Sequence, residues 1–526
     1  MPQSIFLGPV YYGEQQDNAR EIEEKLNANF AELYAAYPAA ASTYPLQLFR
    51  LSVSSTDGTV DSPTVTQTKL NRMLSALRTA GAPLPTSPVQ LDPVSPTGFS
   101  WNTGPVVNSA LRQTAAPTVP SWQIMGGYND QGYAPRVSGA SSLQHFSRKR
   151  LITNVALTQL GVLEDGFYVG GSSGGQDTAL ANAIPISHQI VSGGAVLTQS
   201  GSPVTVPAGA GAYPCLAYVA AIPAGTTLLV DKQAKVASTG MHVGAETLVY
   251  SSQGASSAVG FKATDGTGSD IGNPTPSGMT LGTGTLLSPA VVGYGVHLYP
   301  TFGLVGDSIL SRNGETSDGD GGPVGLEGRT VTGGAWGRRA MYLAGVAASR
   351  EIGYKHLARP SAAMTGLRAG GAQRRAYYPY FSHLVIQMGT NDIGTGRNVD
   401  QLRADVEAEI AAYRAIWAAA NPGLPCYAIV CTLLPRVSST GSTSRTALSP
   451  LIEAYNALVR GGGIAGSNGY LDPNAAVRSA GDETLWASSA DEADGLHPSS
   501  AGHAKIAAAT APYFARATSP WISFQV

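Results

Sequence analysis

Cysteine and charged residues are scarce in this chain, and each shortage limits what the protein can be. Its 526 residues include three cysteines, and such a small odd number is not a disulfide framework. Cys426 and Cys431 lie five positions apart in a strand-like run, so their side chains point to opposite faces and cannot easily pair. We therefore expect buried free thiols at Cys215, Cys426 and Cys431.

Charged residues make up 13% of the chain and the net charge is -2, which gives no reason to expect nucleic acid or an anionic membrane as a partner.

Targeting, membrane and metal signatures are also missing. The first residues, MPQSIFLGPVYYGEQQDN, contain no basic stretch followed by an apolar core, so we expect no secretory signal and, for action outside a cell, another route of export. No apolar run approaches the ~20 residues that a membrane helix needs. Neither H-E-x-x-H nor paired Cys-x-x-Cys occurs, so we expect no metal and no other cofactor.

Glycine and apolar residues are abundant instead. The chain contains 63 glycines, and 43% of its residues are hydrophobic, a composition that disordered proteins seldom have. The length is too great for one ordinary domain and suggests two to four. We expect folded material with many short strands and glycine-rich turns.

Residues 1–100 are predicted to form a short helical segment and a stiff linker. Apolar residues recur at three- and four-residue steps over residues 17–34 and again over 70–77, which is typical of amphipathic helices. Five prolines follow within residues 83–96, and neither a helix nor a central strand tolerates them. The helices could be core elements, trimer contacts or a docking peptide, and the sequence does not choose.

Residues 101–298 have the pattern of a β-rich module. Short β-prone runs alternate here with Gly, Pro, Ser and Asn turns, which favours a β-sandwich or jelly roll. Such a module could bind carbohydrate or serve as a spacer without a ligand, and both interpretations stay open. The runs are ISHQIV, AVLTQ, CLAYVAAI, TTLLVD and ETLVYSS.

Residues 299–526 have the pattern of an α/β domain. The strand-like runs FGLVG, HLVIQMG and CYAIVCTLL alternate with three helix-like stretches. This alternation indicates a parallel sheet with helices on both faces. Catalytic residues of such sheets lie in loops beyond the carboxyl ends of the strands, so functional motifs should directly follow the strands.

Three motifs occupy such positions. Gly306-Asp307-Ser308 follows FGLVG, Gly389-Thr390-Asn391-Asp392 follows HLVIQM, and Asp494-Gly495-Leu496-His497-Pro498 precedes the last helix-like stretch. In these blocks the chain resembles the SGNH (GDSL-like) hydrolase family, over residues 299–518. The resemblance implies a three-layer, flavodoxin-like parallel sheet and a serine esterase activity.

The motifs supply the parts of a nucleophilic triad. A serine hydroxyl becomes an effective nucleophile when an imidazole takes its proton, so Ser308 is the expected nucleophile and His497 the expected base. An acid must hold the imidazole in the right tautomer. Asp494 lies three residues before His497, so one short turn can present both side chains to Ser308.

The tetrahedral intermediate also needs hydrogen-bond donors for its oxyanion. The side-chain amide of Asn391 and the backbone N–H of Ser308 are the expected donors. The family normally takes a third N–H from a glycine, and Ser361 occupies that place within HLARPSAAMTGL, with Gly366 as the alternative. Three further motif residues are expected to support the site by shaping its turns: Gly306, Asp307 and Gly389.

Other reactive-looking residues receive structural interpretations. Gly170–Gly174 fits the G-x-S-x-G nucleophile elbow, but β-rich sequence follows it, which favours a loop. His503 is expected on the surface of the last helix. Asp491 and Glu492 would be the triad acid only if the turn were unusual. The insert 312–334 lacks the order of ligands in a calcium loop and is expected to be a mobile substrate loop.

Two functions of different classes fit these features. The first is an esterase that removes acyl groups, most simply O-acetyl, from a carbohydrate. The second is a structural or adhesive protein of a virion or cell surface that keeps a hydrolase fold for carbohydrate binding. The start of the chain also looks like the attachment segments of phage tail proteins, and the resemblance then implies deacetylation of host surface polysaccharide and contacts with other virion proteins.

Overall fold

The computed structural model describes most of the chain beyond residue 118. The described stretches are residues 119–126, 134–138, 143–170, 174–246, 289–311 and 335–515, with short pieces at 261–262, 271 and 280–281. All of them belong to one compact unit, Thr114–Phe524. The helices expected before residue 100 and the insert 312–334 lie outside the described residues, and they and the domain boundaries stay predictions.

The β-rich module contains two antiparallel sheets. The first has the order β1 (Ser121–Ile124), β15 (Ala290–Gly295), β4 (Leu157–Glu164), β10 (Tyr213–Ile222). The second has the order β3 (Gln144–Ile152), β11 (Thr227–Lys235), β7 (Ile184–Ser192), β8 (Ala195–Gln199), and β9 (Val204–Val206) also pairs with β7. The described residues also form three two-stranded pairs: β5 (Phe167–Val169) with β6 (Asp177–Ala179), β2 (Ala134–Val137) with β12 (His242–Glu246), and β13 (Phe261–Lys262) with β14 (Thr280–Leu281).

One apolar cluster joins the two large sheets. Leu160 and Val162 of β4 pack with Ile190 of β7 and Val230 of β11. Apolar residues on the facing sides of both sheets are thereby removed from water, which is the main stabilisation of such a module. Four of the five predicted runs lie in β7, β8, β10 and β11, whereas ETLVYSS is described only at its first residue, Glu246. The β-rich region is therefore confirmed, and its jelly-roll topology stays a prediction.

The second half of the unit contains a five-stranded parallel sheet. Its order is β17 (Tyr354–His356), β16 (Phe302–Gly306), β18 (His383–Gln387), β19 (Tyr427–Cys431), β20 (Gly469–Leu471). Every neighbouring pair is parallel. The three predicted strands are β16, β18 and β19, in the middle of the sheet.

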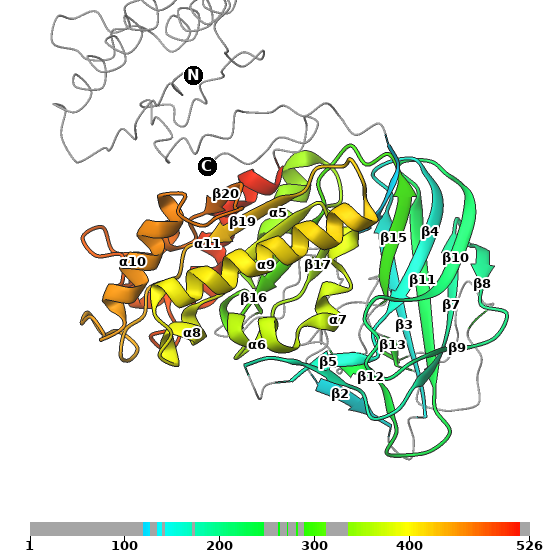
Figure 1. Ribbon diagram of the computed structural model, residues 1–526. Coiled ribbons are helices and arrows are strands. Elements are labelled where there is room, and N and C mark those ends of the chain that lie inside the picture. The colour runs from blue at the N-terminus through cyan, green and yellow to red at the C-terminus, as the bar shows by residue number, and fades with distance from the viewer. Residues whose placement is uncertain are drawn as a thin grey trace, which may run out of the picture. The chain divides into compact units, whose positions relative to one another are not determined.

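Helices cover both faces of this sheet because its buried strands are apolar on both sides. On one face, Val305 and Ile386 pack with Val406 of α9 (Val399–Ala420) and with α10 (Ser449–Arg460). On the other face, Leu304 packs with Trp336 of α5 (Trp336–Ala348) and with α11 (Ser500–Ala515). Figure 1 shows α9 running across the first face. The classification of this layering as flavodoxin-like stays a prediction.

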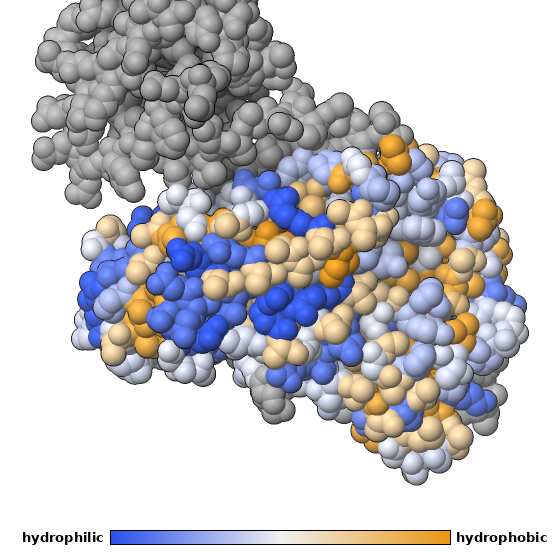
Figure 2. All heavy atoms as spheres, in the orientation of Figure 1, coloured by the Kyte–Doolittle hydropathy of each residue, from blue (hydrophilic) through white to orange (hydrophobic). Residues whose placement is uncertain are grey.

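The long helix α9 has the expected amphipathic pattern. Its bounds are those of the predicted stretch VDQLRADVEAEIAAYRAIWAAA, with Leu402, Val406 and Tyr413 buried. Its outer side is rich in alanine, seen in Figure 2 as a pale band between hydrophilic residues. Asn398 caps the helix through a capping box with Gln401, which satisfies N–H groups that the first turn leaves without partners.

The remaining helices are short and connect the strands. They are α4 (Ser308–Ser311), α6 (Met364–Gly370), α7 (Ala372–Arg375) and α8 (Thr390–Gly394), with 3-10 turns η2 (Tyr378–Tyr380), η3 (Asn474–Ala476) and η4 (Ser489–Asp491). Among the described helices, none has the length and apolar character required to cross a membrane.

The cysteines lie in both halves of the unit and are all free thiols. Cys215 and Cys431 are buried, as expected, and burial raises the pKa of both thiols. The prediction was wrong for Cys426, which is only partly buried. It lies one residue before β19 begins, so its side chain is not enclosed as the strand residues are.

Candidate active site

Three side chains form a continuous hydrogen-bond chain at the carboxyl edge of the parallel sheet. The Oγ atom of Ser308 lies 2.9 Å from Nε2 of His497. Nδ1 of His497 lies 2.7 Å from Oδ2 of Asp494. Ser308 and His497 are 189 residues apart in sequence, so the fold brings together the two motifs that sequence reasoning had paired.

The loop that carries Asp494 and His497 is held by the carboxylate of Asp494. Oδ1 of Asp494 accepts hydrogen bonds from the backbone N–H groups of Leu496 and His497, at 3.0 and 2.8 Å. Partial burial raises the pKa of Asp494, but the bonds from the backbone and side chain of His497 outweigh it and bring the pKa below its usual range. Asp494 therefore stays ionised, as an acid that orients an imidazole must.

Ser308, the expected nucleophile, is the first residue of α4, just beyond β16. Its turn is tight, because a Cβ atom on Gly306 would lie 2.6 Å from Cβ of Leu310. Oδ1 of Asp307 accepts from the backbone N–H of Ile309 at 3.0 Å. Asp307 thus shapes the turn by a hydrogen bond, as expected for a side chain at this position.

The expected third oxyanion block follows β17, beside the nucleophile turn. The backbone N–H of Arg359 donates to the carbonyl of Gly306 at 3.1 Å. Ser361 has a φ of 64°, a left-handed conformation that glycine adopts more readily than serine. The alternative donor, Gly366, lies inside α6 and is buried.

Asn391 lies in α8, after β18, and contacts the segment that contains Ser361. Its Nδ2 donates to the carbonyl of Ala362 at 2.8 Å. An amide nitrogen carries two hydrogens, so one remains for another acceptor. Asn391 does not cap α9, since Asn398 does. Gly389, before it, has a φ of 134° and a Cβ there would lie 2.7 Å from Leu402, which fits its expected supporting role.

Asp392 is a structural residue of the site that sequence reasoning missed. Its buried carboxylate accepts from the backbone N–H groups of Met364 and Thr365, at 2.8 and 3.1 Å. These are the first N–H groups of α6, and a carboxylate there satisfies them and complements the helix dipole. Asp392 therefore fixes the start of α6, three residues after Ser361.

The buried carboxylate of Asp392 lies close enough to Asp307 to affect the pKa of Asp307. Burial and, to a smaller extent, the charge of Asp392 raise the pKa of Asp307 to about 7, against the hydrogen bond from Ile309. Unfolded, Asp307 would ionise near 3.8. The folded state therefore holds the proton over a range in which the unfolded chain has lost it.

We expect the free energy of unfolding to fall between about pH 4 and 7 through Asp307, and to be unaffected by this group above pH 7. The shift corresponds to at most about 4 kcal/mol. Asp307→Asn cannot titrate, so the stability difference between variant and wild type should move in the variant's favour over that range. Urea denaturation from pH 4.5 to 8 measures it, and a difference that is constant with pH would contradict the assignment.

Glu492 is a second supporting residue without a sequence signal. Its buried carboxylate accepts from the backbone N–H of Gly495, inside the acid–base loop, and from that of Gly441 at 2.6 Å. Gly441 belongs to a loop whose Val437 N–H donates to the carbonyl of Gly495 at 2.9 Å. Glu492 therefore holds the Asp494–His497 turn against a neighbouring loop and does not contact the imidazole.

Two other expectations have clear outcomes. Asp491 is buried and pairs with Lys505 at 2.8 Å, so it does not face His497. The surface position expected for His503 was wrong. His503 is fully buried, and its Nδ1 lies 3.2 Å from the backbone N of Trp336, because α11 packs on α5 through this side.

The second serine motif and the possible metal ligands were the other candidates for a site. Ser172 of the Gly170–Gly174 motif lies outside the described residues. Within the described part of the chain, no group of three or more His, Cys, Asp or Glu side chains is arranged to hold a metal ion.

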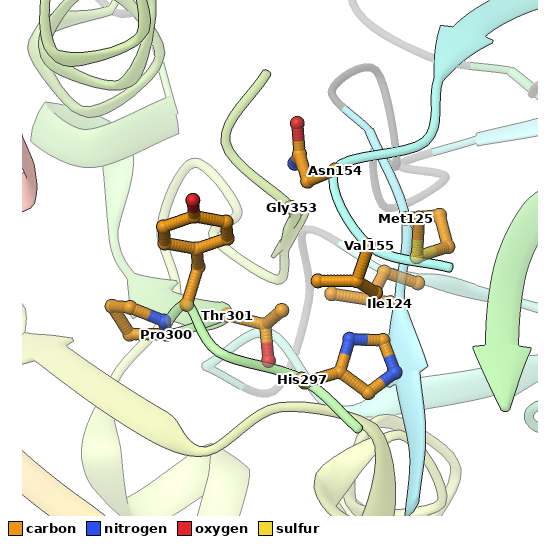
Figure 3. Close-up of a pocket in the computed structure, with 9 residues that line it drawn as sticks. Ile124, Met125, Asn154, Val155, His297, Pro300, Thr301 and Gly353 are labelled. Atoms are coloured by element: carbon orange, nitrogen blue, oxygen red, sulfur yellow. The ribbon is translucent and has the colours of Figure 1, made fainter. Parts of the chain in front are cut away.

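A small cavity lies at the opposite edge of the sheet. It has a volume of about 10 Å³ and is lined by residues including Thr301 and Gly353, which precede β16 and β17. Figure 3 shows His297, Thr301 and Asn154 around it. Such a volume holds about one water, and the amino ends of the strands face away from Ser308. This cavity is therefore not a substrate site.

Residues 304–505 match the GDSL-like lipase/acylhydrolase family. A search among curated proteins found no match. Among solved structures, the chain is similar to an acetylxylan esterase from Geobacillus stearothermophilus, with 15% identity over 41% of this chain and 94% of that chain and a TM-score of 0.29. It is also similar to a family two carbohydrate esterase from Clostridium thermocellum in complex with cellohexaose, with 14% identity over 73% of this chain and 97% of that chain and a TM-score of 0.29.

Proposed function

We propose that the protein is a serine esterase. Its residues 304–505 belong to the GDSL-like lipase/acylhydrolase family. The observation that carries the proposal is the chain of two hydrogen bonds from Ser308 Oγ through His497 to Asp494, at 2.9 and 2.7 Å. Nucleophile, base and orienting acid in this order are the arrangement that acyl transfer requires.

The imidazole tautomer follows from its two partners. The ionised Asp494 accepts a hydrogen bond, so Nδ1 of His497 carries the proton. Nε2 is then left with a lone pair toward the hydroxyl of Ser308. It takes the hydroxyl proton as Oγ attacks the acyl carbonyl, and returns it to the alcohol that leaves. His497 then takes a proton from a water molecule that attacks the acyl-enzyme, and returns it to Oγ of Ser308 as the acid is released.

The oxyanion is stabilised by three donors in this proposal. The second N–H of Asn391 is one, since the first is bonded to Ala362. The backbone N–H groups of Ser308 and Ser361 are the others, and neither donates to an acceptor among the residues that the structure describes. Donors that wait without a partner are suited to a charge that appears only during the reaction.

A short acyl group on a carbohydrate is the substrate we favour. The side chain of Asp494 is 56% exposed, so this end of the triad lies open to solvent. The apolar groove between α5 and α11, lined by Leu343, Ala508 and Pro512, lies on the helical face and not at the triad. Neither this groove nor the small cavity at the amino ends of the strands is lined by Ser308, and a short group such as O-acetyl needs no deep channel.

Acetate release tests the proposal. Wild-type protein should release acetate from O-acetylated polysaccharides and should hydrolyse 4-nitrophenyl acetate faster than the corresponding octanoate. If the wild type binds a polysaccharide but releases acetate no faster than Ser308→Ala, the adhesive function is favoured instead. Faster hydrolysis of the octanoate would contradict the short acyl group while leaving the esterase intact.

Asn391→Ala is expected to lower kcat by about 100- to 1,000-fold with little change in KM, because the lost donor acts mainly in the transition state. Asn391→Asp should be at least as harmful, since a carboxylate faces both the developing oxyanion and the carbonyl of Ala362. Steady-state kinetics on 4-nitrophenyl acetate measure both variants.

Asn398→Asp is the matched control for the Asn391 variants. Asn398 is a cap of α9, and Asp and Asn cap about equally well, so kcat should stay near the wild-type value. Near-normal turnover in Asn391→Asp would show that Asn391 only shapes its loop.

A further inference from the structure

We propose that the β-rich module is part of the catalytic apparatus, because the β5–β6 hairpin positions the backbone N–H of Ser361. This inference rests on the esterase function proposed above. The hairpin comprises β5, β6 and the described loop residues Gly170 and Gly174–Gln176. Figure 1 shows β5 beside the region of α6 and α7.

Hydrogen bonds from the hairpin hold both sides of Ser361. On one side, Nε of Arg359 donates to the carbonyl of Val169 at 2.5 Å. On the other side, the backbone N–H of Ala363 donates to the carbonyl of Gly174 at 2.8 Å. The chain is thus fixed two residues before and two residues after Ser361, and both acceptors belong to the β-rich module.

A buried ion pair anchors the hairpin itself. Nε of Arg374 lies 2.6 Å from Oδ1 of Asp177, and both side chains are fully buried. The backbone N–H of Arg374 donates to the second carboxylate oxygen at 2.9 Å, and Nη2 donates to the carbonyl of Gly175 at 2.5 Å. A fork of charge-assisted bonds fixes orientation as well as distance. The position of Gly175 on the sheet domain is therefore closely defined.

Gly175 packs directly against the residue after Ser361. Its φ is 77°, and a Cβ atom there would lie 2.7 Å from Cβ and 2.8 Å from Cα of Ala362. Real Cβ atoms essentially never approach so closely, so a side chain at Gly175 must displace the segment. The same Ala362 accepts the hydrogen bond from Asn391.

The conformation of Ser361 explains why such support is needed. A left-handed φ of 64° is a strained conformation for a residue other than glycine. It persists only where the surroundings determine it. The family's usual glycine would adopt this conformation freely, whereas serine depends on contacts outside its own loop. The hairpin supplies two of them, and Asn391 supplies a third through Ala362.

Gly175→Ala tests the proposal against a matched control, Gly225→Ala. Gly225 lies in the same module with a φ of 80°, and nothing lies within 4 Å of a Cβ built on it. Both variants therefore carry similar backbone strain, but only Gly175→Ala pushes on Ala362. We expect kcat on 4-nitrophenyl acetate to fall about 10- to 100-fold in Gly175→Ala, as for small misplacements of catalytic groups, with KM within about twofold. In Gly225→Ala, both constants should stay near wild type.

The outcomes are distinguishable from failure of the esterase function. Wild-type protein no faster than Ser308→Ala would end the esterase proposal. An active wild type with equal kcat in Gly175→Ala and Gly225→Ala would overturn the positioning role alone. A parallel rise in KM with unchanged kcat would also overturn it, since an oxyanion donor acts in the transition state.

Arg374→Lys covers the case in which Gly175→Ala does not fold. Lysine keeps the positive charge beside Asp177 but cannot reproduce the fork that reaches the carbonyl of Gly175. A several-fold loss in kcat, with KM unchanged and the far-ultraviolet circular dichroism of the wild type, is expected. Wild-type kcat in this folded variant would overturn the proposal.

Discussion

Replacing Ser308 with alanine is expected to lower kcat on 4-nitrophenyl acetate by about 10⁴- to 10⁶-fold, the range seen when a nucleophile is removed. The hydroxyl of Ser308 bonds to His497, and alanine fits the buried start of α4 without a new contact. The thermal unfolding temperature should therefore stay within a few degrees of the wild type. Steady-state and single-turnover kinetics measure the loss.

Ser311→Ala is the control on the same short helix. Oγ of Ser311 donates to the carbonyl of Ser308 at 3.3 Å, so its removal perturbs the helix without touching the imidazole. Its kcat should stay within a few-fold of wild type. Substantial activity in Ser308→Ala would assign the nucleophile elsewhere, and Ser172→Ala would then test the second glycine-rich serine motif.

The strands of the parallel sheet and the motifs beside them could be predicted from sequence because their signals are local. Strands such as FGLVG are apolar on both faces, which marks a buried parallel strand. Their carboxyl ends meet at one edge, so motifs after different strands become neighbours. Asp494 and His497 share one turn, and the family's spacing favoured Asp494 over Asp491 and Glu492 as the acid.

The residues that sequence reasoning missed depend on contacts between distant segments. Glu492 bonds to Gly441, 51 residues earlier, and Arg374 pairs with Asp177, 197 residues earlier. No periodicity records such pairs. His503 was misplaced for the same reason, since the helix stretch does not show that its partner α5 covers this side. The trimer, the virion contacts and the route of export stay predictions.

Asp494→Asn is expected to lower kcat by about 10³- to 10⁴-fold, as when the acid of a triad is made neutral. The amide oxygen can still accept from the backbone N–H groups of Leu496 and His497, so the turn keeps its geometry. Its NH₂ group, however, would face Nδ1 of His497. That contact favours the tautomer with the proton on Nε2, which cannot take the proton of Ser308. Kinetics from pH 5 to 9 measure the loss.

Asp491→Asn separates this electronic effect from a structural one. Asp491 lies on the same segment and is buried against Lys505. Its replacement leaves the ammonium group of Lys505 without its partner, which lowers the free energy of unfolding. It does not touch His497, and kcat below the unfolding temperature should stay within a few-fold of wild type. Equal losses of kcat in the two asparagine variants would mean that the acid is assigned wrongly. Loss confined to Asp494→Asn identifies Asp494 as the residue that sets the tautomer of the base.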